Sequence, residues 1–178
     1  MPKSALIIID MYSRYDFPGA DSLAEQGPGT VERIGECRRL AASCDVPVVF
    51  ANDIHDHFSG SRESIYARAL DGEHPELVRP LEPAENDSFV HKGQHSAFYG
   101  TPMAHLLHEW GIDRLILTGQ VTEQCVLYTA LDAHVRHYDV TVLTDCVSSI
   151  DPELGDAALR MMAGNMGADL STSNEWNP

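Results

Sequence analysis

The chain has 178 residues, of which 43% are hydrophobic, and carries a formal net charge of −15 at pH 7. This length predicts one domain, residues 1–178, and the negative charge disfavours nucleic acid and anionic membranes as partners. The sequence has no apolar run of about 18 residues that would predict a membrane helix. Its first residues, MPKSALIIIDMY, turn acidic too soon for a signal peptide, so a cytoplasmic location is expected.

Buried strands and amphipathic helices alternate along the chain. Apolar, β-branched runs predict six strands, at residues 4–9, 46–51, 87–91, 114–118, 139–143 and 168–172. Periodic patterns predict helices at residues 30–44, 63–71, 101–110, 123–137 and 152–166, and the glycines and prolines of residues 11–29 predict a long loop. Such alternation indicates an α/β fold: a three-layer, doubly wound, six-stranded parallel sheet with helices on both faces.

Three reactive side chains follow three of the predicted strands. Asp10 comes directly after residues 4–9, Lys92 after residues 87–91, and Cys125 in the segment after residues 114–118. Because the carboxyl ends of parallel strands share one edge of a sheet, we expect a carboxylate, an ammonium group and a thiol to meet in one crevice. There the carboxylate would take the thiol proton, and the ammonium group would stabilise the thiolate.

Cys125 is expected in the first turn of a helix that Thr122 caps and Glu123 begins. Unpaired backbone N–H groups and the helix dipole favour an anion at this place, so the pKa of the thiol is predicted to be lowered. The same turn amides are candidates for binding an oxyanion. The alternative interpretation is a small buried cysteine that behaves as a hydrophobic residue.

Lys92 stands out because the only other lysine is Lys3 and the remaining basic side chains are arginines. An internal lysine in such a chain indicates a need for a compact ammonium group, which arginine does not provide; chance retention is the alternative. The other cysteines are Cys37, Cys44 and Cys146. Since no CxxC pair occurs, neither a zinc knuckle nor a redox dithiol is predicted.

A polar segment after residues 46–51 contains metal-binding side chain types: Asp53, His55, Asp56 and His57. Asp53 and His55 are candidate ligands for a divalent cation, but a polar loop with surface histidines is the favoured interpretation, so no metal is expected to be required. The first predicted strand is followed by DMYSRY rather than by a glycine-rich phosphate turn. A flavin or nicotinamide cofactor is therefore not expected.

Three segments surround the reactive side chains: LIIIDMYSRYDFPG, VHKGQHSAFYGTPM and LILTGQVTEQCVLYTALDA. With these segments the chain resembles the isochorismatase-like cysteine hydrolase family along nearly its whole length. The resemblance implies an Asp–Lys–Cys triad at Asp10, Lys92 and Cys125, a cis peptide bond between Val121 and Thr122, and assembly into dimers or tetramers. Family members include nicotinamidases and N-carbamoyl amide hydrolases. The isochorismatases that cleave an enol ether lack the cysteine, so Cys125 implies C–N hydrolysis.

The resemblance thus implies a cysteine-dependent hydrolase of a small amide or carbamoyl substrate that works through a thioester. Aromatic side chains in loops near the motifs are candidates for the pocket wall, with packing of the loops as the alternative: Tyr15, Phe17, Phe98 and Tyr99. Ser13 and Arg14 stand where related sequences often carry Asn-Asp. Asp53 and His55 match part of the nicotinamidase metal motif, but His57 lies closer than the usual second histidine. A metal-assisted amidase and a catalytically silent binding or scaffold protein remain the alternatives.

Overall fold

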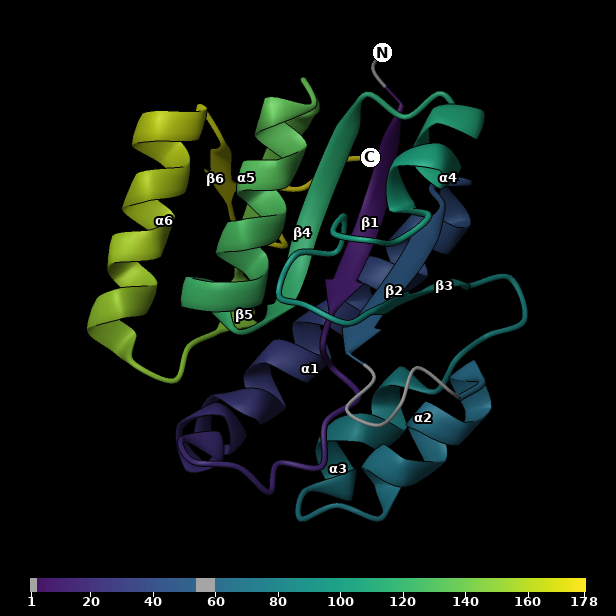
Figure 1. Ribbon diagram of the computed structural model, residues 1–178, viewed down its shortest axis with the longest axis vertical. Coiled ribbons are helices and arrows are strands. Elements are labelled where there is room, and N and C mark those ends of the chain that lie inside the picture. The colour runs from purple at the N-terminus through teal and green to yellow at the C-terminus, as the bar shows by residue number, and fades with distance from the viewer. Residues whose placement is uncertain (1–2, 54–59) are drawn as a thin grey trace.

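A computed structural model describes residues 3–53 and 60–178 of the chain (Figure 1). In this part of the chain six parallel strands form a sheet in the order β3-β2-β1-β4-β5-β6. The strands are β1 (Ser4–Ile9), β2 (Val48–Asp53), β3 (Ser88–Lys92), β4 (Arg114–Gln120), β5 (Asp139–Ser148) and β6 (Asp169–Ser171). The predicted α/β fold with a six-stranded parallel sheet is confirmed.

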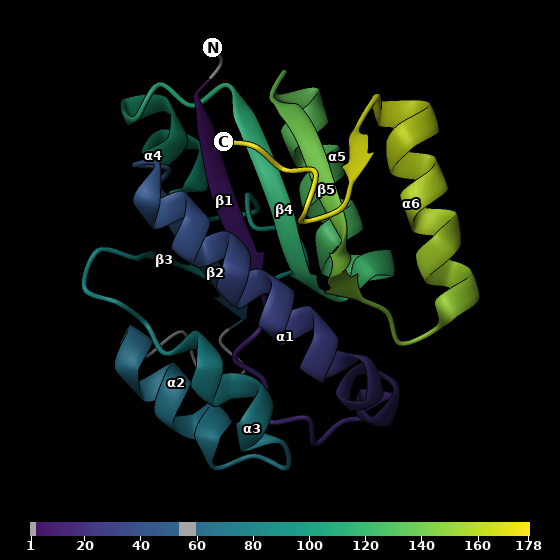
Figure 2. The same cartoon turned by 180° about the vertical axis from the view of Figure 1, so that it is seen from behind.

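Helices connect the strands and cover both faces of the sheet. They are α1 (Ala20–Ser43), α2 (Arg62–Leu70), α3 (Pro75–Val78), a 3₁₀ turn η1 (Arg79–Leu81), α4 (Met103–Glu109), a π-helical turn η2 (Thr122–Val126), α5 (Leu127–Val135) and α6 (Pro152–Met166). Figure 1 shows α4 and α5 in front of the sheet, and Figure 2 shows α1 crossing the opposite face with α2 and α3 beside it. No helix in the described ranges is both long and apolar enough to cross a bilayer.

Alternate side chains of the central strand enter two separate cores. Leu6 and Ile8 of β1 pack in the core beneath α1, α2 and α3. Ala5, Ile7 and Ile9 of the same strand pack in the core beneath α4, α5 and α6. All five of these side chains are buried. This two-sided burial explains the uninterrupted apolar run of the strand and puts its polar end, Asp10, at the carboxyl edge of the sheet.

The first helix begins ten residues earlier than the sequence predicted, at Ala20 instead of residue 30. The prediction of a loop rested on Gly27, Pro28 and Gly29, all of which lie inside α1. Burial of the α1 side chains against the sheet outweighs their low helix propensity. Gly27 is itself buried, and a Cβ there would lie 2.6 Å from Leu77, so its lack of a side chain lets α1 approach α3.

Smaller differences concern the ends of elements. Thr101, the first residue of the predicted helix 101–110, lies just before α4, where its hydroxyl accepts a hydrogen bond from the Met103 amide at 3.2 Å. The helix itself begins after Pro102. β5 continues to Ser148, five residues beyond the predicted end at residue 143, because Val147 and Ser148 pair with β4 after a register shift. This extension brings the end of β5 to the same sheet edge as the end of β4 and Asp10.

Candidate active site

Asp10 is the first residue after β1 and is held at the sheet edge from several sides. Its φ of 51° lies in the left-handed region, which aspartate tolerates better than most residues. Its Oδ1 accepts a hydrogen bond from the Asp53 amide at 2.8 Å, and its backbone oxygen accepts one from Gln120 Nε2 at 2.9 Å. Burial raises the pKa of the Asp10 carboxyl, while Lys92 and hydrogen bonds to the carboxylate act in the opposite direction. The result is a stronger base than an exposed aspartate.

Lys92 is the last residue of β3 and its side chain is completely buried. Its Nζ lies 2.7 Å from Oδ2 of Asp10 and 3.7 Å from Oδ2 of Asp53, and it donates a hydrogen bond to the Gln94 oxygen at 3.2 Å. Burial lowers the pKa of Lys92, but the negative charges around it more than compensate, and the net shift is upward. The buried ammonium group is therefore charged and paired.

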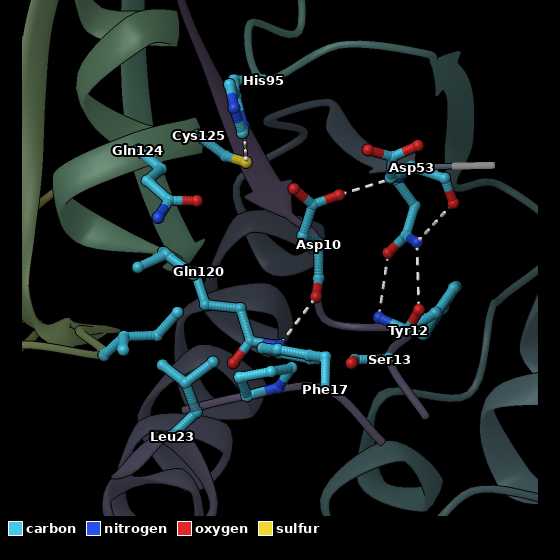
Figure 3. Close-up of a pocket in the computed structure, with 14 residues that line it drawn as sticks. Asp10, Tyr12, Ser13, Phe17, Leu23, Asp53, His95, Gln120, Gln124 and Cys125 are labelled. Carbon is cyan, nitrogen blue, oxygen red and sulfur yellow. Dashed lines mark hydrogen bonds between the residues drawn. The ribbon is translucent and has the colours of Figure 1, made fainter. Parts of the chain in front are cut away.

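Cys125 lies in η2, and its sulfur is in contact with the same ammonium group. The sulfur, Sγ, lies 3.6 Å from Nζ of Lys92 and 3.5 Å from Nδ1 of His95. The structure thus brings together Asp10, Lys92 and Cys125, the three side chains that the sequence predicted to meet. Figure 3 shows the sulfur with His95 on one side and Asp10 on the other.

The predicted lowering of the Cys125 pKa is wrong for the free protein. Burial, and then the charge of Asp10, raise the pKa of this thiol to about 12, against the weaker opposite effects of Lys92 and of a backbone hydrogen bond from Val121. The prediction considered only the start of a helix. In the structure the thiol is buried beside a carboxylate, and both conditions favour its protonated form.

The turn before Cys125 also differs from the prediction in two details. The cis peptide bond joins Gln120 to Val121, one residue before the predicted Val121–Thr122 bond. The Val121 carbonyl instead begins the helix, because it accepts hydrogen bonds from the amides of Gln124 and Val126 at 3.1 Å each. Thr122 does not cap this turn; its hydroxyl donates to the Ser148 oxygen at 2.9 Å, which ties η2 to β5.

A cavity of about 310 Å³ opens beside the sulfur. Asp10, Cys125 and Val121 line it, together with Tyr12, Ser13, Phe17, Pro18, Leu23, Asn52, Asp53, His95, Gln120, Gln124 and Ile150 (Figure 3). One wall is apolar and comes from the segment before α1, from α1 and from Ile150. The opposite wall carries carboxylate, amide and imidazole groups. Such a combination suits a small molecule with an apolar body and a polar reacting group.

Of the four aromatic residues predicted to line the pocket, Phe17 does so. Tyr15 is buried behind the wall, with its hydroxyl 3.3 Å from Nε2 of Gln120. The prediction is wrong for Phe98 and Tyr99, which do not line the described cavity. Phe98 is buried against Tyr138, which lies between α5 and β5, and Tyr99 is 67% exposed. The loop after β3 directs His95, rather than its aromatic residues, into the cavity.

His95 and the two glutamines are site residues that sequence reasoning missed. His95 comes three positions after Lys92, a spacing that placed it in the same loop without indicating its direction. Gln120 is the last residue of β4 and Gln124 belongs to η2, so both follow from the rule that strand ends collect at one edge. Asp53 lies beside Lys92, whereas His55 falls outside the described residues. The expectation that no metal is required at Asp53 and His55 therefore stays a prediction.

This arrangement of side chains can perform nucleophilic chemistry. The sulfur is next to a buried base, an ammonium group stabilises negative charge on either of them, and the cavity gives access to the sulfur. The amides at the start of η2 lie at the same point, where a helical turn begins and partial positive charge collects. These are the components that attack on a carbonyl group requires.

Known proteins are similar to this chain in sequence and in fold. The isochorismatase domain model matches residues 4–175. The isochorismatase family protein YaaI of Bacillus subtilis is 30% identical over 96% of this chain and 94% of its own length. A protein of Arabidopsis thaliana described as a probable inactive nicotinamidase is 27% identical over 98% of this chain and 95% of its own. The crystal structure of N-carbamoylsarcosine amidase from Thermoplasma acidophilum superposes with a TM-score of 0.76 at 28% identity, covering 99% of both chains.

Proposed function

The chain belongs to the isochorismatase family, and from this premise we propose that it is a cysteine-dependent hydrolase that cleaves the C–N bond of a small amide or carbamoyl compound. The observation that carries the proposal is the contact of Cys125 Sγ with Lys92, whose Nζ lies 2.7 Å from Asp10, at the wall of a cavity. The similarity to an amidase of known structure supports the reaction class.

In the first half-reaction we assign the base to Asp10 and the nucleophile to Cys125. The substrate enters the cavity and excludes water from the sulfur, and Asp10 takes the thiol proton as the sulfur attacks the carbonyl carbon. Lys92 stabilises the negative charge that moves between sulfur and carboxylate. Because the pKa of the thiol is about 12 in the free protein, the thiolate forms together with the attack and not beforehand.

The tetrahedral intermediate carries its charge on the former carbonyl oxygen. We assign the stabilisation of this oxyanion to backbone amides of the turn that begins at Val121 and Thr122 and contains Cys125. Collapse of the intermediate breaks the C–N bond, and the proton held by Asp10 passes to the departing nitrogen, which leaves as ammonia or an amine. An acyl or carbamoyl thioester remains on Cys125, and water hydrolyses it.

A screen of small amides and ureides for ammonia release tests this function. Wild-type protein is expected to release ammonia from at least one compound, and Cys125→Ala is expected to release none above the background. The alternative, a catalytically silent member of the family, is favoured if no compound is turned over and if p-nitrophenyl acetate leaves no acetyl group on Cys125 by intact-mass measurement. Turnover by Cys125→Ala at the wild-type rate would contradict the mechanism.

We also propose that the chain forms a homo-oligomer. Large apolar side chains are exposed on neighbouring helices α5 and α6, namely Tyr128, Leu131, Val135, Leu154 and Met161. Exposed apolar side chains on adjacent helices are typical of a protein interface. Light scattering after gel filtration is expected to give a mass above that of one chain, and Leu131→Glu is expected to reduce it. A monomeric wild-type protein would contradict this proposal.

A further inference from the structure

His95 makes a contact with the reacting sulfur that the triad does not require. Its Nδ1 lies 3.5 Å from Sγ of Cys125, and the imidazole lines the cavity. In Figure 3 the ring approaches the sulfur from the side away from Asp10. A titratable group in contact with the nucleophile, with access to the cavity, can move a proton at that atom.

The loop that carries His95 is anchored on both sides. Just before it, the Gln94 oxygen accepts a hydrogen bond from Lys92 Nζ at 3.2 Å. Just after it, the Ala97 amide donates to the Thr129 hydroxyl of α5 at 3.0 Å. The imidazole also stacks on the ring of Tyr128, with centroids 5.4 Å apart and planes inclined by 26°. The contact with the sulfur is therefore part of a supported arrangement, although His95 itself is exposed.

The carboxylate of Asp10 is held by two neighbours. Its two carboxylate oxygens are engaged by the Asp53 amide at 2.8 Å and by Lys92 Nζ at 2.7 Å. Asp10 also lines the cavity, on the other side of the sulfur from His95 (Figure 3). Nδ1 of His95, in the tautomer with its proton on Nε2, is a base on the cavity side. Its distance from the sulfur leaves it near the carbonyl carbon that is bonded to that sulfur in the thioester.

We infer that His95 is a catalytic residue for hydrolysis of the thioester, a step that rests on the proposed function. The oxygen of a water molecule forms a bond to the thioester carbon, and the proton that it loses passes to Nδ1 of His95. The C–S bond then breaks, and the same proton passes from Nδ1 to the departing sulfur. The acid is released and Cys125 returns as a thiol, so that no other reactant is needed.

The reaction with p-nitrophenyl acetate separates this step from the first one. Its nitrophenolate leaving group needs no proton, so an initial burst reports acylation of Cys125 and the steady rate that follows reports hydrolysis of the acetyl thioester. His95→Asn is the informative variant, because its side-chain amide retains a polar atom near the position of Nδ1 but does not transfer protons. His105→Asn, on the exposed face of α4, is the matched control.

In His95→Asn we expect the burst to stay close to that of wild type and the steady rate to fall about 10²-fold or more. Acetyl protein should accumulate, and hydroxylamine, which attacks thioesters without a general base, should restore turnover. The melting temperature and the His105→Asn kinetics should match wild type. A steady rate equal to that of wild type would overturn the inference about His95 but not the proposed function. A burst that falls as much as the steady rate would do the same. A wild-type protein without any burst would contradict the proposed function and this step with it.

Discussion

The Nζ atom of Lys92 lies 2.7 Å from Oδ2 of Asp10, and the lysine side chain has no exposure to solvent. A charge buried in this way costs several kcal/mol unless it is paired. Here the pair is also the connection between β3 and the end of β1, across β2. The ion pair therefore has two consequences, one for stability and one for the reactivity of the neighbouring thiol.

Lys92→Met should destabilise the protein by about 3–5 kcal/mol, because it leaves the Asp10 carboxylate buried without its partner. Asp10→Asn combined with Lys92→Met removes both charges and should recover more than half of this loss. Urea unfolding at pH 7 measures both values. If the double variant is no more stable than Lys92→Met, the cost arises from packing of the lysine chain and not from the unpaired charge.

Asp10→Asn should separate thiol reactivity from turnover. Burial is the largest reason for the high pKa of Cys125, and the negative charge of Asp10 adds to it. Removing that charge while Lys92 remains should lower the thiol pKa and accelerate alkylation of Cys125 by iodoacetamide at pH 8. Ammonia release should fall about 10²–10⁴-fold, since the base is lost.

Peptide mass spectrometry follows this alkylation residue by residue, with the exposed Cys44 as an internal reference whose rate should not change. Slower alkylation of Cys125 in Asp10→Asn would show that the carboxylate activates the thiol in the free protein. That result would contradict the direction of the Cys125 pKa shift.

The strand ends and their reactive side chains follow from the sequence for a general reason. A strand buried on both faces has a continuous apolar run, so the first polar residue after it marks the sheet edge, as Asp10 does after β1. The rule gives the edge but not the direction of a side chain. Phe98 and Tyr99 are in the correct loop, yet they do not line the cavity that His95 lines.

Two other errors have the same origin, because local sequence does not report tertiary contacts. The helix start at Cys125 predicts a lowered pKa, but burial of the thiol and the charge of Asp10, which is distant in sequence and becomes a neighbour only in the fold, raise it. Likewise, Gly27 and Pro28 predict a loop, and only the packing of α1 against the sheet and α3 makes that segment helical.

The high pKa of Cys125 should appear as a dependence of stability on pH. Above pH 9 an unfolded thiol ionises, whereas the folded thiol stays protonated to about pH 12. The folded state then holds one more proton, so stability falls as pH rises, by up to about 1.4 kcal/mol per pH unit. The serine in Cys125→Ser does not titrate. The free energy of unfolding of this variant, relative to that of wild type, should therefore increase between pH 9 and 10. A difference in unfolding free energy that does not change with pH would contradict this.

Gly119 allows β4 to approach β1 beside Asp10. Its φ is +109°, and a Cβ there would collide with the backbone oxygen of Ile9 and lie 2.7 Å from its nitrogen. Gly119 also pairs with Ile9 in the sheet register. Gly119→Ala should therefore cost about 2 kcal/mol or more, from the left-handed backbone and the clash. It should also reduce ammonia release further than the loss of folded protein explains, because the clash displaces the residue next to Asp10.

Gly29→Ala is the matched control for this substitution. Gly29 is an exposed residue of α1, and a Cβ there would meet nothing within 4 Å. Alanine should raise stability by up to about 1 kcal/mol through helix propensity, with unchanged activity. Urea unfolding and ammonia release, measured on both variants, distinguish a local effect at the β1–β4 contact from a general intolerance of the fold. Equal losses in the two variants would show that Gly119 has no special role in positioning Asp10.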